Sequence, residues 1–146
     1  MERKWLYQYR TGDFYVEPYM LNHLNILHGG ELVRQCDSAI GLLASAYAGT
    51  SVLTAAIKEF SFKRRSQIGD HINFEVSLIE TSSRTMTFYA TINLERLNGT
   101  NLKVGETIFI FVAVNKDFKP ITIPTFTPKD INQKQFIKRI KQQFHL

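Results

Sequence analysis

Cysteine is scarce in this sequence, which contains one, Cys36, among 146 residues. A single thiol cannot form an internal disulfide, and this is typical of proteins of the reducing cytoplasm. Long apolar runs are missing too, since no stretch approaches the roughly 18 residues that cross a bilayer. The charged start, MERKWLYQYR, lacks the apolar segment of a secretory signal. We therefore expect a cytoplasmic protein that is not inserted in a membrane.

Several enzyme signatures are also missing. The sequence has no G-x-S-x-G elbow, no Walker loop and no dinucleotide-binding glycine motif. Its four histidines do not have the spacing of metal ligands, so we expect no metal site. Cys36 falls on the apolar side of a predicted helix, where an inert buried thiol is favoured over a nucleophile.

Charge of one sign is in excess only near the C-terminus. The formal net charge is +5, and most of it comes from residues 129–146. This segment contains one acidic residue, Asp130, and five basic ones: Lys129, Lys134, Lys138, Arg139 and Lys141. The remainder is nearly balanced, which disfavours an extended surface for nucleic acid.

Hydrophobic periodicity predicts the order of the elements. Residues 7–18 favour one or two short strands around a Thr-Gly-Asp turn, and residues 30–48 have a helical period that ends before Gly49. Four strands are then predicted, at 51–62, 72–78, 86–94 and 107–114, the last of them buried on both faces. The turns between them are TSSR (81–84) and Asn98-Gly99.

One long helix beside a mainly antiparallel sheet indicates an α+β domain. The helix is apolar over much of its circumference, so a sheet that curls around it would bury it best. We expect a single domain over residues 1–126. Residues 127–146 are predicted to form a basic amphipathic helix with Phe136, Ile137, Ile140 and Phe144 on its apolar side.

An acidic residue, Asp37, interrupts the border of the apolar side of the long helix. It could be an ordinary boundary residue paired with Arg34 or Lys58. The preceding His28-Gly29-Gly30 favours a functional role, because the first N–H groups of a helix are unpaired and glycine allows close approach. Amides that can bind a carbonyl oxygen, followed by a carboxylate that can act as base or nucleophile, point to acyl transfer.

The spacing of these residues resembles a known family. Asn22, His28-Gly29-Gly30 and Asp37 are similar to the N-x5-[HF]-G-G-x6-D signature of hot-dog-fold acyl-CoA thioesterases. Downstream pieces match in order over most of the chain, from about residue 16 to 124: Thr54, then Phe62, Arg64, Gly69 and Asp70 in FSFKRRSQIGD, the TSSRTM hairpin, and FVAVNKDFKPITIP.

The resemblance implies a sheet wrapped around the helix and dimers that stack into hexamers or tetramers. It also implies sites shared between subunits, with Asn22 of one facing Asp37 of its partner. Asp37 would activate water, Asn22 would position it, and the amide at Gly30 would polarise the thioester carbonyl. His28 would either bond the carbonyl or hold the loop. No cofactor is implied, since coenzyme A is part of the substrate.

Coenzyme A carries phosphates, which arginine binds well. The basic cluster Lys63-Arg64-Arg65 and the hairpin residues Ser82, Ser83 and Arg84 are the candidates, and Arg64 is the first choice because it matches the family position. Surface charge without a ligand is the alternative for each of them.

The residues leave two other functions open and disfavour a third. The chain could be a non-catalytic acyl-CoA sensor, or a hydrolase of phenylacetyl or other aryl thioesters, because HGG resembles that branch. A hot-dog dehydratase is disfavoured because its catalytic histidine motif is missing.

Overall fold

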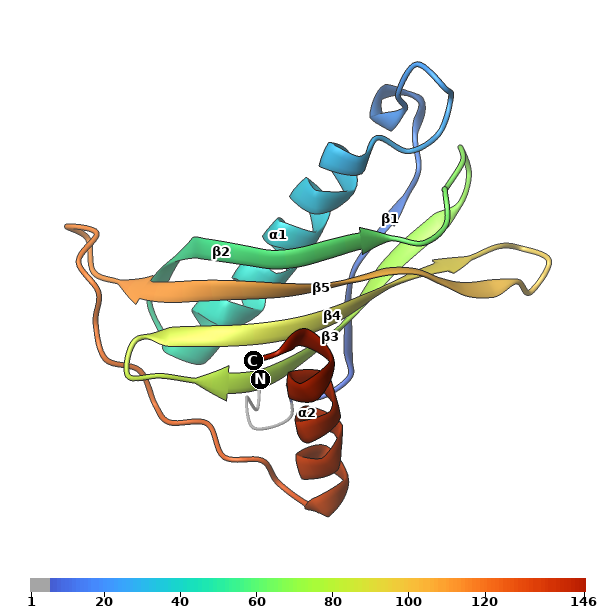
Figure 1. The fold of residues 1–146 in the computed structure, drawn as a ribbon. Coiled ribbons are helices and arrows are strands. Elements are labelled where there is room, and N and C mark those ends of the chain that lie inside the picture. Colours follow the sequence, from blue (N-terminus) through green and yellow to red (C-terminus); the bar gives the residue numbers. More distant parts are fainter. Residues whose placement is uncertain (1–5) are drawn as a thin grey trace.

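The computed structural model of the protein describes residues 6–146. A five-stranded antiparallel sheet curves around one long helix, α1 (Gly29–Ala48), and a second helix, α2 (Ile131–Phe144), packs on the other face of the sheet (Figure 1). This arrangement confirms the predicted α+β architecture. Within the described residues, no helix combines the length and apolar character needed to cross a bilayer.

The sheet has the order β1-β3-β4-β5-β2, so that β1 and β2 are its edges. All neighbouring strands run antiparallel. A short 3₁₀ turn, η2 (Pro18–Met20), precedes α1. The strands are β1 (Tyr9–Tyr15), β2 (Ser51–Phe62), β3 (His71–Thr81), β4 (Thr85–Glu95) and β5 (Asn101–Val114).

Helix α1 forms the centre of the core and matches the predicted helix to within one residue. It ends at Gly49, whose φ of 72° is the left-handed conformation that glycine adopts easily. The apolar side of the helix is buried against the concave face of the sheet; its buried members are Leu32, Cys36, Ala39, Ile40, Leu43, Ala44 and Tyr47. Burial raises the pKa of the Cys36 thiol, as suits an unreactive core residue.

Strand β1 passes so close to α1 that it needs a glycine. Gly12 has a φ of 70°, and a Cβ added there would lie 2.7 Å from the Phe74 ring and 2.8 Å from the Ala39 side chain. The Thr-Gly-Asp sequence therefore produces an irregularity within one strand rather than a turn between two.

Strand β5 differs from its prediction on its outer face. Phe109 and Phe111 are buried against the core around α1, and Ile108 is buried under α2. Ile110 and Val112 are only half-buried, whereas Val114 at the end of the strand is buried again. Burial on both faces is thus wrong at Ile110 and Val112.

Helix α2 joins the sheet through apolar packing and one buried acid. Phe136, Ile137 and Ile140 are buried in a cluster with residues of β3, β4 and β5, which confirms the predicted apolar side. Beside them, Glu106 of β5 is 3% exposed. It accepts hydrogen bonds from the Tyr89 hydroxyl (3.0 Å) and from Nε2 of Gln143 (3.0 Å).

The third partner of Glu106 is Lys63, whose Nζ lies 2.6 Å from Oε2, and Nζ of Lys103 lies 3.3 Å from the same oxygen. Burial alone would raise the pKa of Glu106, but the hydrogen bonds from Lys63, Tyr89 and Gln143 outweigh it and lower the pKa to about 2. The ionised carboxylate therefore fastens α2 and the end of β2 to the middle of the sheet.

Stability in acid tests this role of Glu106. A carboxyl group whose pKa falls from 4.5 to about 2 on folding stabilises the protein above pH 4.5, and this contribution disappears as the pH falls toward 2. Glu106→Gln should therefore lower the melting temperature at pH 7 and reduce the pH dependence of unfolding between pH 4.5 and 2. An unchanged acid slope in the variant would show that Glu106 does not carry this linkage; Asp117→Asn, at an exposed position, is the control.

Candidate active site

A cleft of about 680 Å³ opens where three segments meet. The N-terminus of α1, the segment after β2 and the β4–β5 hairpin converge at this end of the molecule (Figure 1). Apolar side chains line part of the cleft, namely Ile26, Leu27, Leu32, Phe62, Leu94, Leu102 and Val104. The polar lining consists of Asn22, Gly29, Lys63, Arg64, Arg65, Ser66, Gln67 and Arg96. Among the described residues, the lining of the cleft thus combines an apolar surface with several cations and contains no carboxylate.

The N-terminus of α1 leaves one amide available in this cleft. Nδ1 of His28 accepts a hydrogen bond from the Gly30 N–H (2.9 Å), so His28 caps the helix with its own ring. The next two amides donate to the His28 carbonyl. Among the described residues, the N–H of Gly29 has no acceptor, and Gly29 lines the cleft. The Gly30 amide expected to donate is therefore engaged by His28 in this structure, and the Gly29 amide beside it is available.

The side chain of Asn22 is held with its amide group free to donate. Its Oδ1 accepts from the backbone N–H of Leu24 (2.9 Å) and of Ile26 (3.4 Å). Asn25 within this loop has a φ of 59°, a left-handed conformation that asparagine tolerates better than most residues. The oxygen is thus engaged, and Nδ2 remains to donate into the cleft that Asn22 lines.

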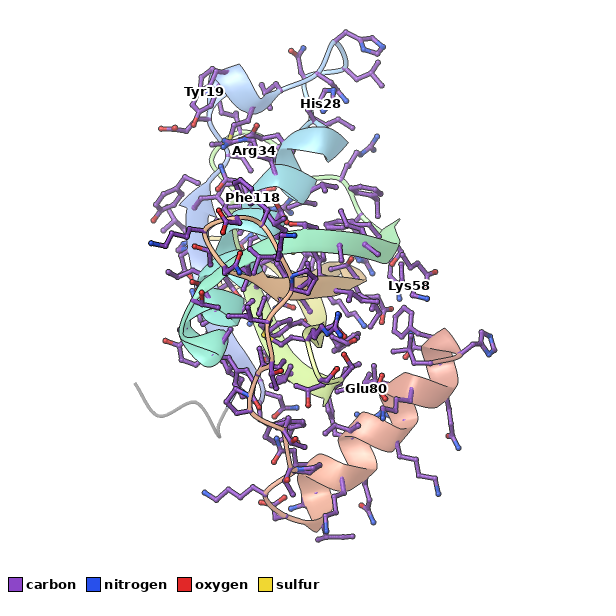
Figure 2. The ribbon with its side chains drawn as sticks, turned by 90° about the vertical axis from the view of Figure 1, so that its left-hand side faces the viewer. Tyr19, His28, Arg34, Lys58, Glu80 and Phe118 are labelled. Atoms are coloured by element: carbon purple, nitrogen blue, oxygen red, sulfur yellow. The ribbon has the colours of Figure 1, made fainter. Side chains whose placement is uncertain are left out.

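Asp37 lies outside the cleft, on the side of α1 that faces β2. Its Oδ1 accepts a hydrogen bond of 2.6 Å from the Thr54 hydroxyl. Neither of the two pairings considered from the sequence is present: Arg34 bonds Glu31 at 2.6 Å. Lys58 projects from β2, well separated from Arg34 and His28 near the start of α1 (Figure 2). Among the described residues, the second oxygen of Asp37, Oδ2, accepts no hydrogen bond and can accept one from another group.

Helix geometry separates Asp37 from the other polar groups of one chain. At about 1.5 Å per residue, Gly29 and Asp37 are roughly 12 Å apart along α1. A helix cannot bend enough to bring them onto one thioester group. The structure therefore brings together Asn22, Gly29 and the basic cluster, but not Asp37.

The candidate cations differ in their availability. Lys63 is engaged with Glu106, as described above, whereas Arg64 and Arg65 form no ion pair within residues 6–146 and both are exposed. Ser82 accepts from the backbone of its own hairpin. The Arg84 carbonyl accepts a hydrogen bond from the N–H of Ala113, near one end of β5. The Arg64 N–H donates to the carbonyl of Val104, toward the other end of the same strand.

This separation along β5 is roughly 30 Å at about 3.3 Å per residue. The hairpin residues Ser82, Ser83 and Arg84 therefore cannot reach the cleft of their own chain.

Two features of the site were missed from the sequence. Thr54 is part of the family pattern, but its bond to Asp37 depends on how β2 lies against α1. Arg96 lines the cleft and is bound to the buried Asp70, a pairing across 26 residues that no local motif signals. Within the described residues, no group of three or more His, Cys, Asp or Glu side chains could hold a metal ion.

Comparison with known proteins places this geometry in a family. The thioesterase superfamily model matches residues 24–98, which include the capped helix start, Asp37, Thr54 and the basic cluster. The chain belongs to the thioesterase superfamily. A crystal structure of an apo-hexameric acyl-CoA thioesterase superimposes with a TM-score of 0.83 at 26% identity and covers 93% of this chain and 90% of that one. The fold of this superfamily member is therefore the hot-dog fold.

Two further relatives extend the comparison. The cytosolic acyl coenzyme A thioester hydrolase of Rattus norvegicus is 21% identical over 121 residues, which are 81% of this chain and 32% of that protein. The chain thus spans about a third of the length of this relative. The Staphylococcus aureus acyl-CoA hydrolase, solved with butyryl coenzyme A and coenzyme A, has a TM-score of 0.81 at 23% identity and covers 91% of this chain and 82% of that one. Structures of it also exist with an asparagine, an aspartate or a threonine replaced by alanine.

The N-cap of α1 gives a prediction that tests whether His28 stabilises the helix through its hydrogen bond to Gly30. His28→Ala should remove the acceptor of the Gly30 N–H and lower the free energy of unfolding by about 1 kcal/mol, as for other N-cap losses. His28→Asn, which supplies a capping oxygen, should restore most of that stability in denaturant titrations. Equal losses in both variants would mean that the ring contributes something other than the cap.

Proposed function

We propose that the protein is an acyl-CoA hydrolase that splits the thioester into a free acid and coenzyme A. The observation that carries this proposal is the cleft itself: an unpaired amide at a helix N-terminus and an oriented Asn22 amide lie beside an apolar surface and two unpaired arginines. Amides of this kind stabilise the oxyanion of an attacked carbonyl. The arginines suit the phosphates of the nucleotide end.

The site is completed by a second copy of the chain, with Asp37 of one subunit facing Asn22 and Gly29 of the other. The edge strand β2 supports this pairing, because it is 12 residues long and leaves Leu53, Ile57 and Phe62 more than 40% exposed. A long exposed apolar edge is unfavourable in a monomer. Leu42 of α1, 68% exposed, adds to the surface that a dimer would cover.

In the mechanism, the thioester carbonyl accepts hydrogen bonds from the Gly29 N–H and the Asn22 amide. The carboxylate of Asp37, oriented by Thr54, removes a proton from water while the water oxygen bonds to the carbonyl carbon. The tetrahedral intermediate then loses coenzyme A as the C–S bond breaks, and the sulfur leaves as a thiolate or takes up the proton. Attack by Asp37 itself, through an anhydride, is the alternative route.

Arg64 and Arg65 contact the substrate phosphates, and Arg64 comes first because it also matches the family position. Lys63 is mainly the counter-ion of Glu106. Ser82, Ser83 and Arg84 can act only on a neighbouring subunit's cleft. No cofactor takes part beyond the coenzyme A of the substrate, and the cytoplasm, where acyl-CoA is available, is the proposed location.

The relatives support this proposal. The asparagine, aspartate and threonine replaced in the S. aureus hydrolase are separated by 15 and 17 residues, the same intervals that separate Asn22, Asp37 and Thr54. That hydrolase binds coenzyme A, and other neighbours form hexamers. We propose that this chain forms dimers that assemble further.

A panel of thioesters from acetyl- to palmitoyl-CoA, with phenylacetyl-CoA, tests the proposed activity through release of free thiol. Asp37→Ala should lower kcat by at least about a hundredfold, the usual size of a general-base contribution, without loss of folding. Asp117→Asn, a distant exposed carboxylate, is the matched control. If the wild type binds the thioesters tightly but hydrolyses none of them, the proposed hydrolase activity is contradicted and an acyl-CoA sensor is favoured.

A further inference from the structure

Arg96 is a cation of the cleft that belongs to neither of the predicted clusters. It follows β4 at the start of the β4–β5 hairpin and lines the same cleft as Arg64 and Arg65. Its backbone is held in the turn, since its N–H donates to the Thr100 carbonyl (2.9 Å) and its carbonyl accepts from the Gly99 N–H (3.0 Å). The backbone from which this side chain extends is therefore held by two hydrogen bonds within the turn.

A buried acid holds one edge of its guanidinium. Nε of Arg96 lies 2.9 Å from Oδ1 of Asp70, and Nη2 lies 3.2 Å from Oδ2. Asp70 is 3% exposed and also accepts the Gln67 N–H at 2.9 Å. Two N–H groups of Arg96 donate to Asp70, and the turn holds the Arg96 backbone. The guanidinium therefore has little conformational freedom left to lose when a ligand binds.

The other edge of the guanidinium is unused. Among the described residues, Nη1 of Arg96 has no hydrogen-bond acceptor, and the Arg96 side chain remains 35% exposed. The carboxylate of Asp70 is 4% exposed and does not line the cleft. The pair thus presents donors to the cleft and keeps its negative end in the protein.

We propose that Arg96 binds a phosphate of the coenzyme A part of the substrate through Nη1, and that Asp70 is its positioning residue. This inference rests on the proposed function. It adds a third cation, held by Asp70, to Arg64 and Arg65, which are exposed and form no ion pair among the described residues. A purely structural Arg96, acting only as the counter-ion of Asp70, is the competing explanation.

Calorimetric titration with three ligands distinguishes the two explanations without requiring turnover. Coenzyme A, dephospho-coenzyme A and pantetheine differ in their phosphates but share the thiol arm. Arg96→Gln should weaken coenzyme A about tenfold, the value of one charge-assisted hydrogen bond, and leave pantetheine unchanged. Asp70→Asn should have the same selective effect, because it frees the guanidinium from its fixed orientation. Lys138→Gln, an exposed cation of α2, is the matched control and should change nothing.

Dephospho-coenzyme A then locates the contact. An equal loss for both nucleotides places it at the diphosphate, and a loss for coenzyme A alone places it at the 3′-phosphate. Unchanged coenzyme A affinity in folded Arg96→Gln, or parallel losses for pantetheine, would overturn the proposal.

If Arg96→Gln does not fold, Arg96→Lys is tested instead. Lysine keeps a cation beside Asp70 but lacks the second N–H edge that would bind the phosphate. It should weaken coenzyme A selectively, and unchanged affinity in this variant overturns the proposal as well. A wild type that binds coenzyme A in an Arg96-dependent way but hydrolyses no thioester would contradict the proposed activity and leave the phosphate contact standing.

Discussion

The rigid spacing along α1 is the constraint on which the candidate site depends. The helix starts with an available amide at Gly29 and carries its carboxylate two turns later, and the core packing of its apolar stripe prevents any rearrangement between them. Under the proposed mechanism, one chain therefore holds two incomplete halves of a site. The long exposed edge at β2, beside Asp37 and Thr54, is where we propose that a second chain supplies the missing half.

Buried acids divide the cations around the cleft into two classes. Glu106 engages Lys63, and Asp70 engages one edge of Arg96, because a buried carboxylate is stable only when it is paired. Arg64 and Arg65 stay exposed and unpaired among the described residues. The same electrostatic rule that stabilises the fold thus selects which cations remain free for an anionic ligand.

Local patterns predicted the elements well because each depends on its own periodicity. The helix over 30–48 and the four later strands follow from spacing and turn residues, although β5 begins at Asn101, six residues before its predicted start. The pairs Thr54–Asp37 and Arg96–Asp70 could not be predicted, because strand register and hairpin geometry bring them together. The ring of His28 accepts the Gly30 amide, in line with the alternative that it holds the loop. The sequence did not indicate that the Gly29 amide is then the one without an acceptor among the described residues.

Co-assembly of two inactive variants tests the shared site most directly. Asn22→Ala and Asp37→Ala chains, co-expressed with different affinity tags, are purified as a random mixture and assayed for thioester hydrolysis. If each site takes Asn22 from one subunit and Asp37 from its partner, half of the dimers regain one intact site, and the mixture should recover about a quarter of wild-type activity by two-fold symmetry. A mixture no more active than its parents would contradict the account.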